Sequence, residues 1–132
     1  MIFVDSSFWI ATRLTRDRHH AAAVALLELH AGADLVTSNH VRGETWTFLR
    51  RKAGHKSASH FLDRVGRTPR LRVLFVSEPL EADALRWLSR HDERAYSFVD
   101  ATSFALMRSL RIREALAFDA DFSAAGFVEL RP

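Results

Sequence analysis

Residues 71–76, Leu-Arg-Val-Leu-Phe-Val, form the clearest strand-like run of this sequence. The run is almost continuously apolar, and such runs are typical of strands that are covered on both faces, as in parallel sheets. Pro69 precedes the run and Pro79 follows it, at a position where proline can open a helix. This stretch therefore predicts a parallel sheet that lies between helical layers.

Other short apolar runs alternate with helical patterns along the chain. Further strands are expected at residues 2–4, 35–37, 115–118 and 127–130. Helices are expected near 8–14 with Ser6-Ser7 as the cap, and at 19–30, 40–52, 57–65, the stretch that follows Pro79, and 97–110. The alternation predicts an α/β fold, a three-layer α/β/α sandwich with a central, mainly parallel sheet of four to five strands.

The composition is that of one ordinary globular domain. Of the 132 residues, 48% are hydrophobic and 27% are charged, and no repeat or linker divides the chain. We therefore expect a single domain over residues 1–132. The chain begins with a strand-like run instead of a signal peptide, and no apolar stretch approaches the roughly 20 residues of a membrane span. These features predict a cytoplasmic protein without membrane contact.

Two features of the composition bear on function. The chain has no cysteine, which excludes disulfide bonds, thiolate zinc sites and cysteine nucleophiles. Lys and Arg total 19, and all of them except Lys52 and Lys56 are arginine. Arginine matches phosphate oxygens well, so this bias is compatible with a polyanionic partner, although a high-GC genome produces the same bias.

Four acidic residues fall where the predicted fold would bring them together. Asp5 and Asp119 directly follow expected strands, and Glu44 and Asp100 lie in the first turns of expected helices. These positions share the carboxyl edge of a parallel sheet, where α/β proteins bind ligands. Each acid alone has a structural explanation as a helix cap, a capping box, a solvated helix residue or a turn residue. Together the four would repel one another unless a divalent cation were bound.

Carboxylate oxygens select hard cations, so the four acids predict a site for Mg²⁺, with Mn²⁺ as a substitute. Such ions polarise a phosphoryl oxygen and lower the pKa of a water molecule. The pattern therefore predicts hydrolysis of a phosphodiester bond without a His, Ser or Cys nucleophile. Asp121 lies two residues after Asp119 and is the alternative for the fourth acid.

Four motifs around these acids resemble the PIN-domain family, and within it the VapC-type toxins of VapBC toxin–antitoxin pairs. They are Ile-Phe-Val-Asp-Ser-Ser at 2–7, Thr-Ser-Asn-His-Val-Arg-Gly-Glu at 37–44, Ser-Phe-Val-Asp-Ala-Thr-Ser-Phe-Ala at 97–105, and Ala-Phe-Asp-Ala-Asp-Phe at 117–122. The third motif is the most specific of the four. The resemblance extends from Ile2 to Phe127 and keeps the order and spacing of the family's motifs.

The resemblance implies a set of metal-binding and catalytic residues, namely Asp5, Glu44, Asp100 and Asp119, with Ser7 and Ser103 as supporting hydroxyls. It implies an Mg²⁺-dependent endoribonuclease that arrests translation by cutting RNA and is neutralised by a cognate VapB-type antitoxin. It also implies a homodimer that binds operator DNA only through the antitoxin.

Three alternatives fit the sequence less well. A receiver-type signalling domain needs an acidic pair near the first strand and a late lysine, but no lysine follows Lys56. A haloacid-dehalogenase-like phosphatase needs Asp-x-Asp after the first strand, where this chain has Asp5-Ser6-Ser7. A catalytically silent PIN-like module that binds RNA or protein stays open as the alternative, although all four acidic positions are filled.

Overall fold

Five parallel strands form the centre of the computed structural model, which describes residues 1–132. They are β1 (Ile2–Val4), β2 (Leu35–Ser38), β3 (Leu71–Leu74), β4 (Glu114–Leu116) and β5 (Val128–Glu129). Their order across the sheet is β3-β2-β1-β4-β5, so the chain builds outward from β1 on one side and then returns to the other. The order in which strands are added to the sheet therefore reverses between β1 and β4.

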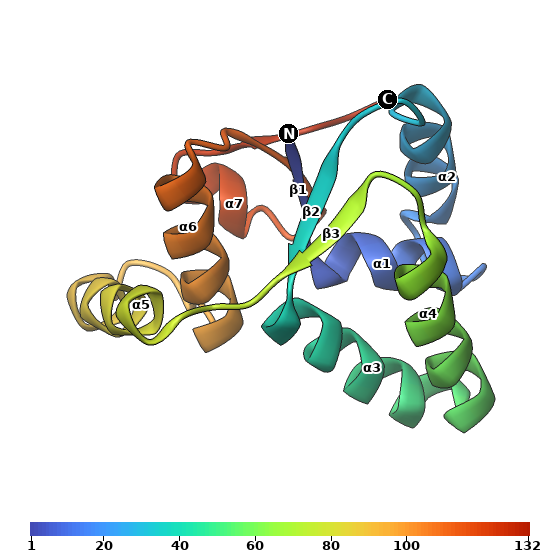
Figure 1. Cartoon of the computed structure of the whole chain (residues 1–132), viewed down its shortest axis with the longest axis horizontal. Coiled ribbons are helices and arrows are strands. Elements are labelled where there is room, and N and C mark those ends of the chain that lie inside the picture. The colour runs from blue at the N-terminus through green and yellow to red at the C-terminus, as the bar shows by residue number, and fades with distance from the viewer.

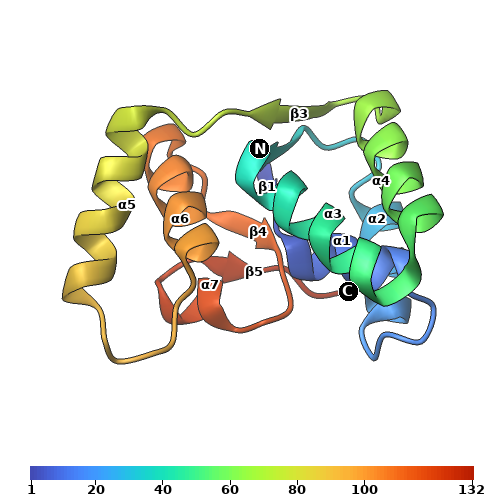
Figure 2. The ribbon, with the colours of Figure 1, turned by 90° about the horizontal axis from the view of Figure 1, so that it is seen from below.

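Seven helices surround the sheet. They are α1 (Ser6–Arg13), α2 (His20–Leu29), α3 (Asn39–Ala53), α4 (His55–Arg67), α5 (Glu78–Arg90), α6 (Phe98–Leu110) and α7 (Asp121–Ala124). Helices α5, α6 and α7 lie on one side of the strands and α1 to α4 lie on the other (Figures 1 and 2). The predicted three-layer α/β/α fold is therefore confirmed. None of these helices is both long enough and apolar enough to cross a membrane.

The expected elements are all present; the first strand has the expected bounds, and the bounds of the others differ. The first helix starts at Ser6 because the carboxylate of Asp5, and not the Ser6-Ser7 pair, caps it. Helix α7 was not expected, because a helix of four residues is too short to show a periodic pattern. The last strand has only two residues, within the expected range 127–130.

The prediction that residues 71–76 form a strand covered on both faces is wrong. Strand β3 ends at Leu74 and lies at the edge of the sheet, where it is only partly buried. The side chain of Phe75 is 69% exposed, and the guanidinium carbon of Arg42 lies 5.6 Å from its ring centre. An apolar run thus correctly predicted a strand of a parallel sheet, but it did not distinguish an edge strand from a central one.

The core is built from the central strands and from α6, the helix that carries the third motif. Phe3, Val4 and Leu116 are fully buried in β1 and β4. Every residue of α6 from Asp100 to Met107 is buried, which is the pattern of a helix covered on all sides. Its Phe104 packs against Phe122 with ring centres 5.0 Å apart. Asp100 is therefore carried by an element whose position is fixed by the core.

Gly54 forms the junction between α3 and α4, which pack against each other. Its backbone has φ 96° and ψ 171°, a region that is essentially restricted to glycine. No heavy atom lies within 4 Å of the position that a Cβ would occupy, so a substitution there adds backbone strain without a clash. We expect Gly54→Ala to lower the free energy of unfolding by about 1–3 kcal/mol in urea denaturation.

Gly66 offers a matched control for this prediction. It lies within α4 and has equally open space around its missing Cβ, but no left-handed backbone. We expect Gly66→Ala to stabilise the protein by about 0.5–1 kcal/mol, because alanine favours the helix. Equal effects of the two substitutions would contradict the assigned role of the Gly54 backbone.

Candidate active site

The carboxyl ends of β1 and β4 lie side by side where the order of the strands reverses. Such switch points create the crevice in which open α/β sheets bind ligands. Asp5 follows β1, Asp119 lies three residues beyond the end of β4, and Asp100 enters from the first turn of α6. One carboxylate oxygen from each of the three lies within 4.8 Å of the other two. The structure therefore brings together three of the four predicted acids.

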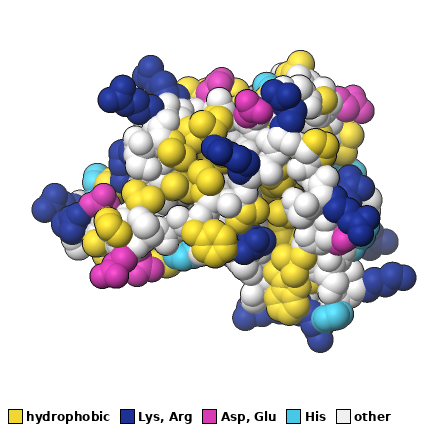
Figure 3. All heavy atoms as spheres, in the orientation of Figure 1, with side chains coloured by type: hydrophobic (Ala, Val, Ile, Leu, Met, Phe, Trp, Pro, Cys, Tyr) yellow, Lys and Arg dark blue, Asp and Glu magenta, His cyan; other side chains and the backbone are white.

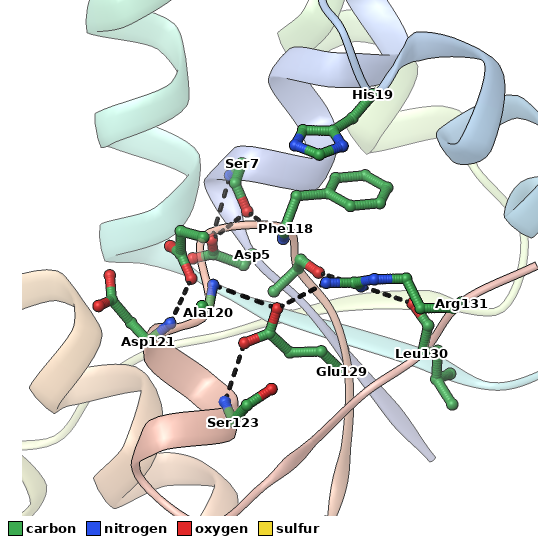
Figure 4. A network of polar contacts seen from close by, with 12 residues as sticks. Asp5, Ser7, His19, Phe118, Ala120, Asp121, Ser123, Glu129, Leu130 and Arg131 are labelled. Carbon is green, nitrogen blue, oxygen red and sulfur yellow. Dashed lines mark hydrogen bonds and ion pairs between the residues drawn. The ribbon is translucent and has the colours of Figure 1, made fainter.

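Ser7 links the two central strands at this edge. Its hydroxyl donates to Asp5 Oδ2 at 2.7 Å and accepts a hydrogen bond from the backbone N–H of Phe118 at 3.0 Å (Figure 4). The backbone N–H of Ser7 donates to the same Asp5 oxygen at 3.1 Å. The carboxylate of Asp5 is thus tied to the segment that carries Asp119.

The other two aspartates are held in a similar way. Asp100 Oδ2 accepts from the backbone N–H of Ser97 at 3.0 Å, and the Ser97 hydroxyl accepts from the backbone N–H of Asp100 at 2.9 Å, which completes a capping box. Asp119 Oδ1 accepts from the backbone N–H of Asp121 at 3.0 Å. In all three carboxylates one oxygen anchors the side chain, while no hydrogen bond of ordinary length occupies the second oxygen.

Burial shapes the electrostatics of this group of carboxylates. It raises the pKa of Asp5 to about 6, against the hydrogen bonds from Ser7, and the charge of Asp100 adds to the rise. Burial likewise raises the pKa of Asp100 and that of Asp119 to about 7, with further increases from neighbouring carboxylates. Keeping all three carboxylates charged in this partly dry site therefore destabilises the folded protein, and a bound cation would offset that loss of stability.

Glu44 lies outside the group of three aspartates. It is exposed on α3, where it lines a groove with His40, Phe48 and Phe98. Loss of surrounding water raises the pKa of its carboxyl group, and an interaction with the side chain of Ser6 opposes that rise. Since Ser6 adjoins Asp5 in the chain, Glu44 lies near the cluster, but its membership in the site stays a prediction.

Asp121, the alternative fourth acid, has a different partner. Its carboxylate is paired with Arg94, whose Nε donates to Asp121 Oδ1. The same guanidinium donates through Nη2 to the backbone carbonyl of Asp119 at 3.1 Å. Asp119 therefore belongs to the cluster of aspartates, whereas Asp121 forms an ion pair with Arg94 at the rim of that cluster.

Ser103 lies on α6, one turn after Asp100. Its hydroxyl is buried and has no hydrogen-bond partner in the structure. A supporting role for Ser103 therefore stays a prediction, whereas the bonds of Ser7 are present.

Glu129 is a contributor that the sequence analysis missed. Its side chain is 2% exposed and accepts from the backbone N–H groups of Ala120 at 3.3 Å and Ser123 at 2.9 Å (Figure 4). Burial alone would raise the pKa of Glu129, but the hydrogen bonds and an ion pair with Arg131 lower it below its usual range. These contacts hold Ala120 in a left-handed backbone and so fix the turn that carries Asp119. No pattern in the sequence marks this role, because the partners lie six to nine residues away along the chain.

The raised pKa of Asp119 predicts a pH-dependent stability in the absence of metal. Between its usual pKa of 3.8 and about 7, the folded protein keeps a proton that the unfolded chain has lost, so this group lowers stability as the pH rises. We expect Asp119→Asn in EDTA to unfold at a higher temperature than the unsubstituted protein at pH 8. The difference should shrink toward pH 4.

The expected gain is on the order of 1 kcal/mol, or about 3–5 °C, because residual exposure of Asp119 to solvent reduces the effect. Asp63→Asn is the control, since Asp63 is half exposed on α4 and pairs only with Arg67. It should change the melting temperature little at either pH. A gain for Asp119→Asn that is the same at pH 4 and pH 8 would argue against the carboxylate cluster as its source.

The whole chain is similar to proteins of known family. A family model described as the PIN domain matches residues 2–128. The 23S rRNA-specific endonuclease VapC20 of Mycobacterium tuberculosis is 52% identical over 132 residues, which cover 100% of this chain and 99% of that protein. The crystal structure of that organism's VapC20, described as a sarcin–ricin loop cleaving toxin, superposes with a TM-score of 0.93 at 51% identity and full coverage of both chains.

A more distant structure shares the same fold. The crystal structure of FitAcB from Neisseria gonorrhoeae has a TM-score of 0.70 at 18% identity, and the match covers 98% of this chain and 95% of the other. The matched family model and the full-length relative agree with the four motifs read from the sequence. The chain therefore belongs to the PIN-domain family.

Proposed function

We propose that this chain is a metal-dependent endoribonuclease that acts as the toxin of a type II toxin–antitoxin pair. The observation that carries the proposal is the group formed by Asp5, Asp100 and Asp119, whose oxygens lie within 4.8 Å of one another. The identity of 52% with a 23S rRNA-specific endonuclease over the whole chain supports the same reaction.

The donor set suits a divalent cation. All three donors are carboxylate oxygens, which favour hard cations such as Mg²⁺ and Mn²⁺ over softer metals. Each carboxylate has one oxygen without a hydrogen bond and a pKa that a nearby positive charge would lower. We assign Mg²⁺ as the ion, with Mn²⁺ as a substitute; when bound, it supplies positive charge to the scissile phosphate and makes a water molecule more acidic.

Other side chains orient the aspartates and add a group that can accept a proton. Ser7 and Ser97 orient Asp5 and Asp100 so that one oxygen of each faces the shared site. Glu44 lies nearby on α3, where partial loss of surrounding water raises the pKa of its carboxyl group, and it is suited to take a proton from water. In this assignment Asp5, Asp100, Asp119 and Glu44 form the catalytic and metal-binding set, and Asp121 does not replace Asp119.

The relative also indicates a substrate. VapC20 is described as specific for 23S rRNA and as cleaving the sarcin–ricin loop. Since the match to it covers the whole chain, we propose the same RNA as the target here. The alternative of a silent RNA- or protein-binding module is tested by the same experiment.

The proposal includes partners. We assign a cognate VapB-type antitoxin that neutralises the chain in the cytoplasm, a homodimer as its assembly, and operator DNA as a ligand of the complex through the antitoxin. Light scattering should give twice the 15.0 kDa mass of the chain for the free toxin. A monomer at every concentration would contradict the homodimer, and operator binding by the toxin alone would contradict the role of the antitoxin.

We expect the purified, antitoxin-free chain to cut an RNA that contains the sarcin–ricin loop in Mg²⁺ or Mn²⁺ but not in EDTA. Asp100→Asn should slow cleavage by about 100-fold or more, because it removes the charge of a metal ligand. Its amide oxygen can still accept the hydrogen bond from the backbone N–H of Ser97, so the capping box of α6 is kept. Glu44→Gln should slow cleavage with a smaller loss of metal affinity, measured by calorimetry with Mn²⁺.

Asp63→Asn is the control and should leave the rate unchanged, since Asp63 lies on α4 and takes no part in the cluster. Cleavage that persists in EDTA, or Asp100→Asn at the rate of the unsubstituted protein, would contradict the proposed site. A folded, metal-loaded protein that binds the RNA without cutting it would favour the silent module.

A further inference from the structure

The face of the protein drawn in Figure 3 carries no single basic patch that would mark an RNA path. On the face shown in Figure 3, Lys and Arg side chains are spread around apolar surface instead of forming one patch. A contact for the nucleotides next to the cleaved bond would have to lie close to the carboxylates. A cavity of about 380 Å³ beside Asp119 offers such a contact.

This cavity shares residues with the candidate active site and adds a wall from the segment before α2, which contributes Asp17 as well as a histidine and an arginine. Ser7 and Asp119 line it on the side of the carboxylates, and Arg18 and His19 line it on the other. Arg18 and His19 directly precede α2 and lie outside the four motifs. The cavity thus connects directly to the place where the scissile phosphate would lie.

The imidazole ring of His19 lies flat on the ring of Phe118. The ring centres are 4.5 Å apart and the planes differ by 2°. Figure 4 shows His19 on one side of the Phe118 ring and Arg131 on the other, and the guanidinium carbon of Arg131 is 5.1 Å from the ring centre. Phe118 is therefore enclosed, while the half-buried His19 is the outermost ring of the stack.

Local hydrogen bonds fix His19 in this place. Its backbone N–H donates to Asp17 Oδ1 at 2.8 Å, and Arg18 Nε donates to the ring nitrogen Nε2 at 3.1 Å. The neighbouring His20 is tied through Nδ1 to the carbonyl of Ala11 at 2.7 Å. The ring is thus held before any ligand arrives, and the Arg18 guanidinium keeps its terminal amino groups free at the surface.

We propose that this cavity binds the nucleotide that flanks the scissile phosphate, with its base stacked on His19 and its phosphate contacted by Arg18. Proteins read unpaired RNA by stacking splayed bases on aromatic or histidine rings, and arginine matches phosphate oxygens. A ring fixed flat against the core and adjoining the carboxylates provides that platform. The proposal rests on the proposed ribonuclease function and names its substrate contact.

The test measures RNA binding without cleavage. Fluorescence anisotropy in EDTA would follow a labelled sarcin–ricin loop RNA with the unsubstituted protein and with His19→Ala, His19→Phe and Arg18→Ala. We expect His19→Ala to weaken binding by about 5- to 100-fold and His19→Phe to stay within about threefold, because phenylalanine keeps the stacking face. Arg18→Ala should weaken binding and reduce the slope of affinity against salt by about one phosphate contact.

Matched controls come from residues of the same type in the same region. His30→Ala, at the far end of α2, and Arg16→Ala, in the same loop as Arg18, should leave the affinity within about twofold, because neither lines the cavity. The ring protons of His19 in the unsubstituted protein give a second readout by NMR. They should shift on addition of the RNA, while those of His30 should not, whatever the stability of the variants.

Several results would overturn the proposal. They are unchanged affinity in His19→Ala, equal weakening in His19→Ala and His19→Phe, and His19 ring signals that do not respond to the RNA. Loss of binding to the cognate antitoxin with unchanged RNA affinity would assign the cavity to the protein partner instead. If the RNA stacks on His19 but metal-loaded protein never cuts it, the proposed ribonuclease function is wrong and the binding site is supported. If the RNA is cut normally but His19 does not respond to it, the binding site is wrong and the ribonuclease function is supported.

Discussion

The candidate site depends on the parallel pairing of β1 with β4. Phe3 pairs with Ala115 and Val4 with Leu116, and the ladder continues past β1 through a hydrogen bond from the backbone N–H of Asp5 to the carbonyl of Leu116 at 3.0 Å. A slip of one residue would turn every side chain of the slipped strand to the opposite face of the sheet. The register of these two short strands therefore decides whether Asp5 can meet Asp119 at all.

Once the strands are in register, each aspartate has two tasks that compete for the same carboxylate. One oxygen of each side chain accepts local hydrogen bonds, which favour the charged form and fix the side chain. The other oxygen is left in a partly dry group of like charges, which favours the neutral form. The hydrogen bonds make the site rigid, and the clustered charges make it unstable without a cation. This local loss of stability is what marks the three aspartates as a cation-binding site.

The parts of the fold that sequence predicts best are those set by local chemistry. Ile2-Phe3-Val4 and the Ser97–Asp100 capping box carry short-range patterns, and both elements form as expected. The exposure of Phe75 and the separation of Glu44 from the aspartates depend on which elements become neighbours, which no local pattern encodes. Glu129 shows the same limit, since its role comes from turning back onto the loop that carries Asp119.

The choice between Asp119 and Asp121 illustrates how spatial partners decide function. In the sequence Asp119 is preferred only because it is the first acid after the expected strand, and Asp121 follows it in an Asp-Ala-Asp turn. In the structure Arg94 pairs with Asp121 and also binds the carbonyl of Asp119, so the carboxylate of Asp121 is engaged in an ion pair and that of Asp119 stays available to the cluster. Asp121 still raises the pKa of both Asp100 and Asp119 by its charge, so the arginine limits how much negative charge the site must hold. The charge of the site is thus set by a residue outside the carboxylate cluster, and removing that residue would change the site's demand for a cation without removing a ligand.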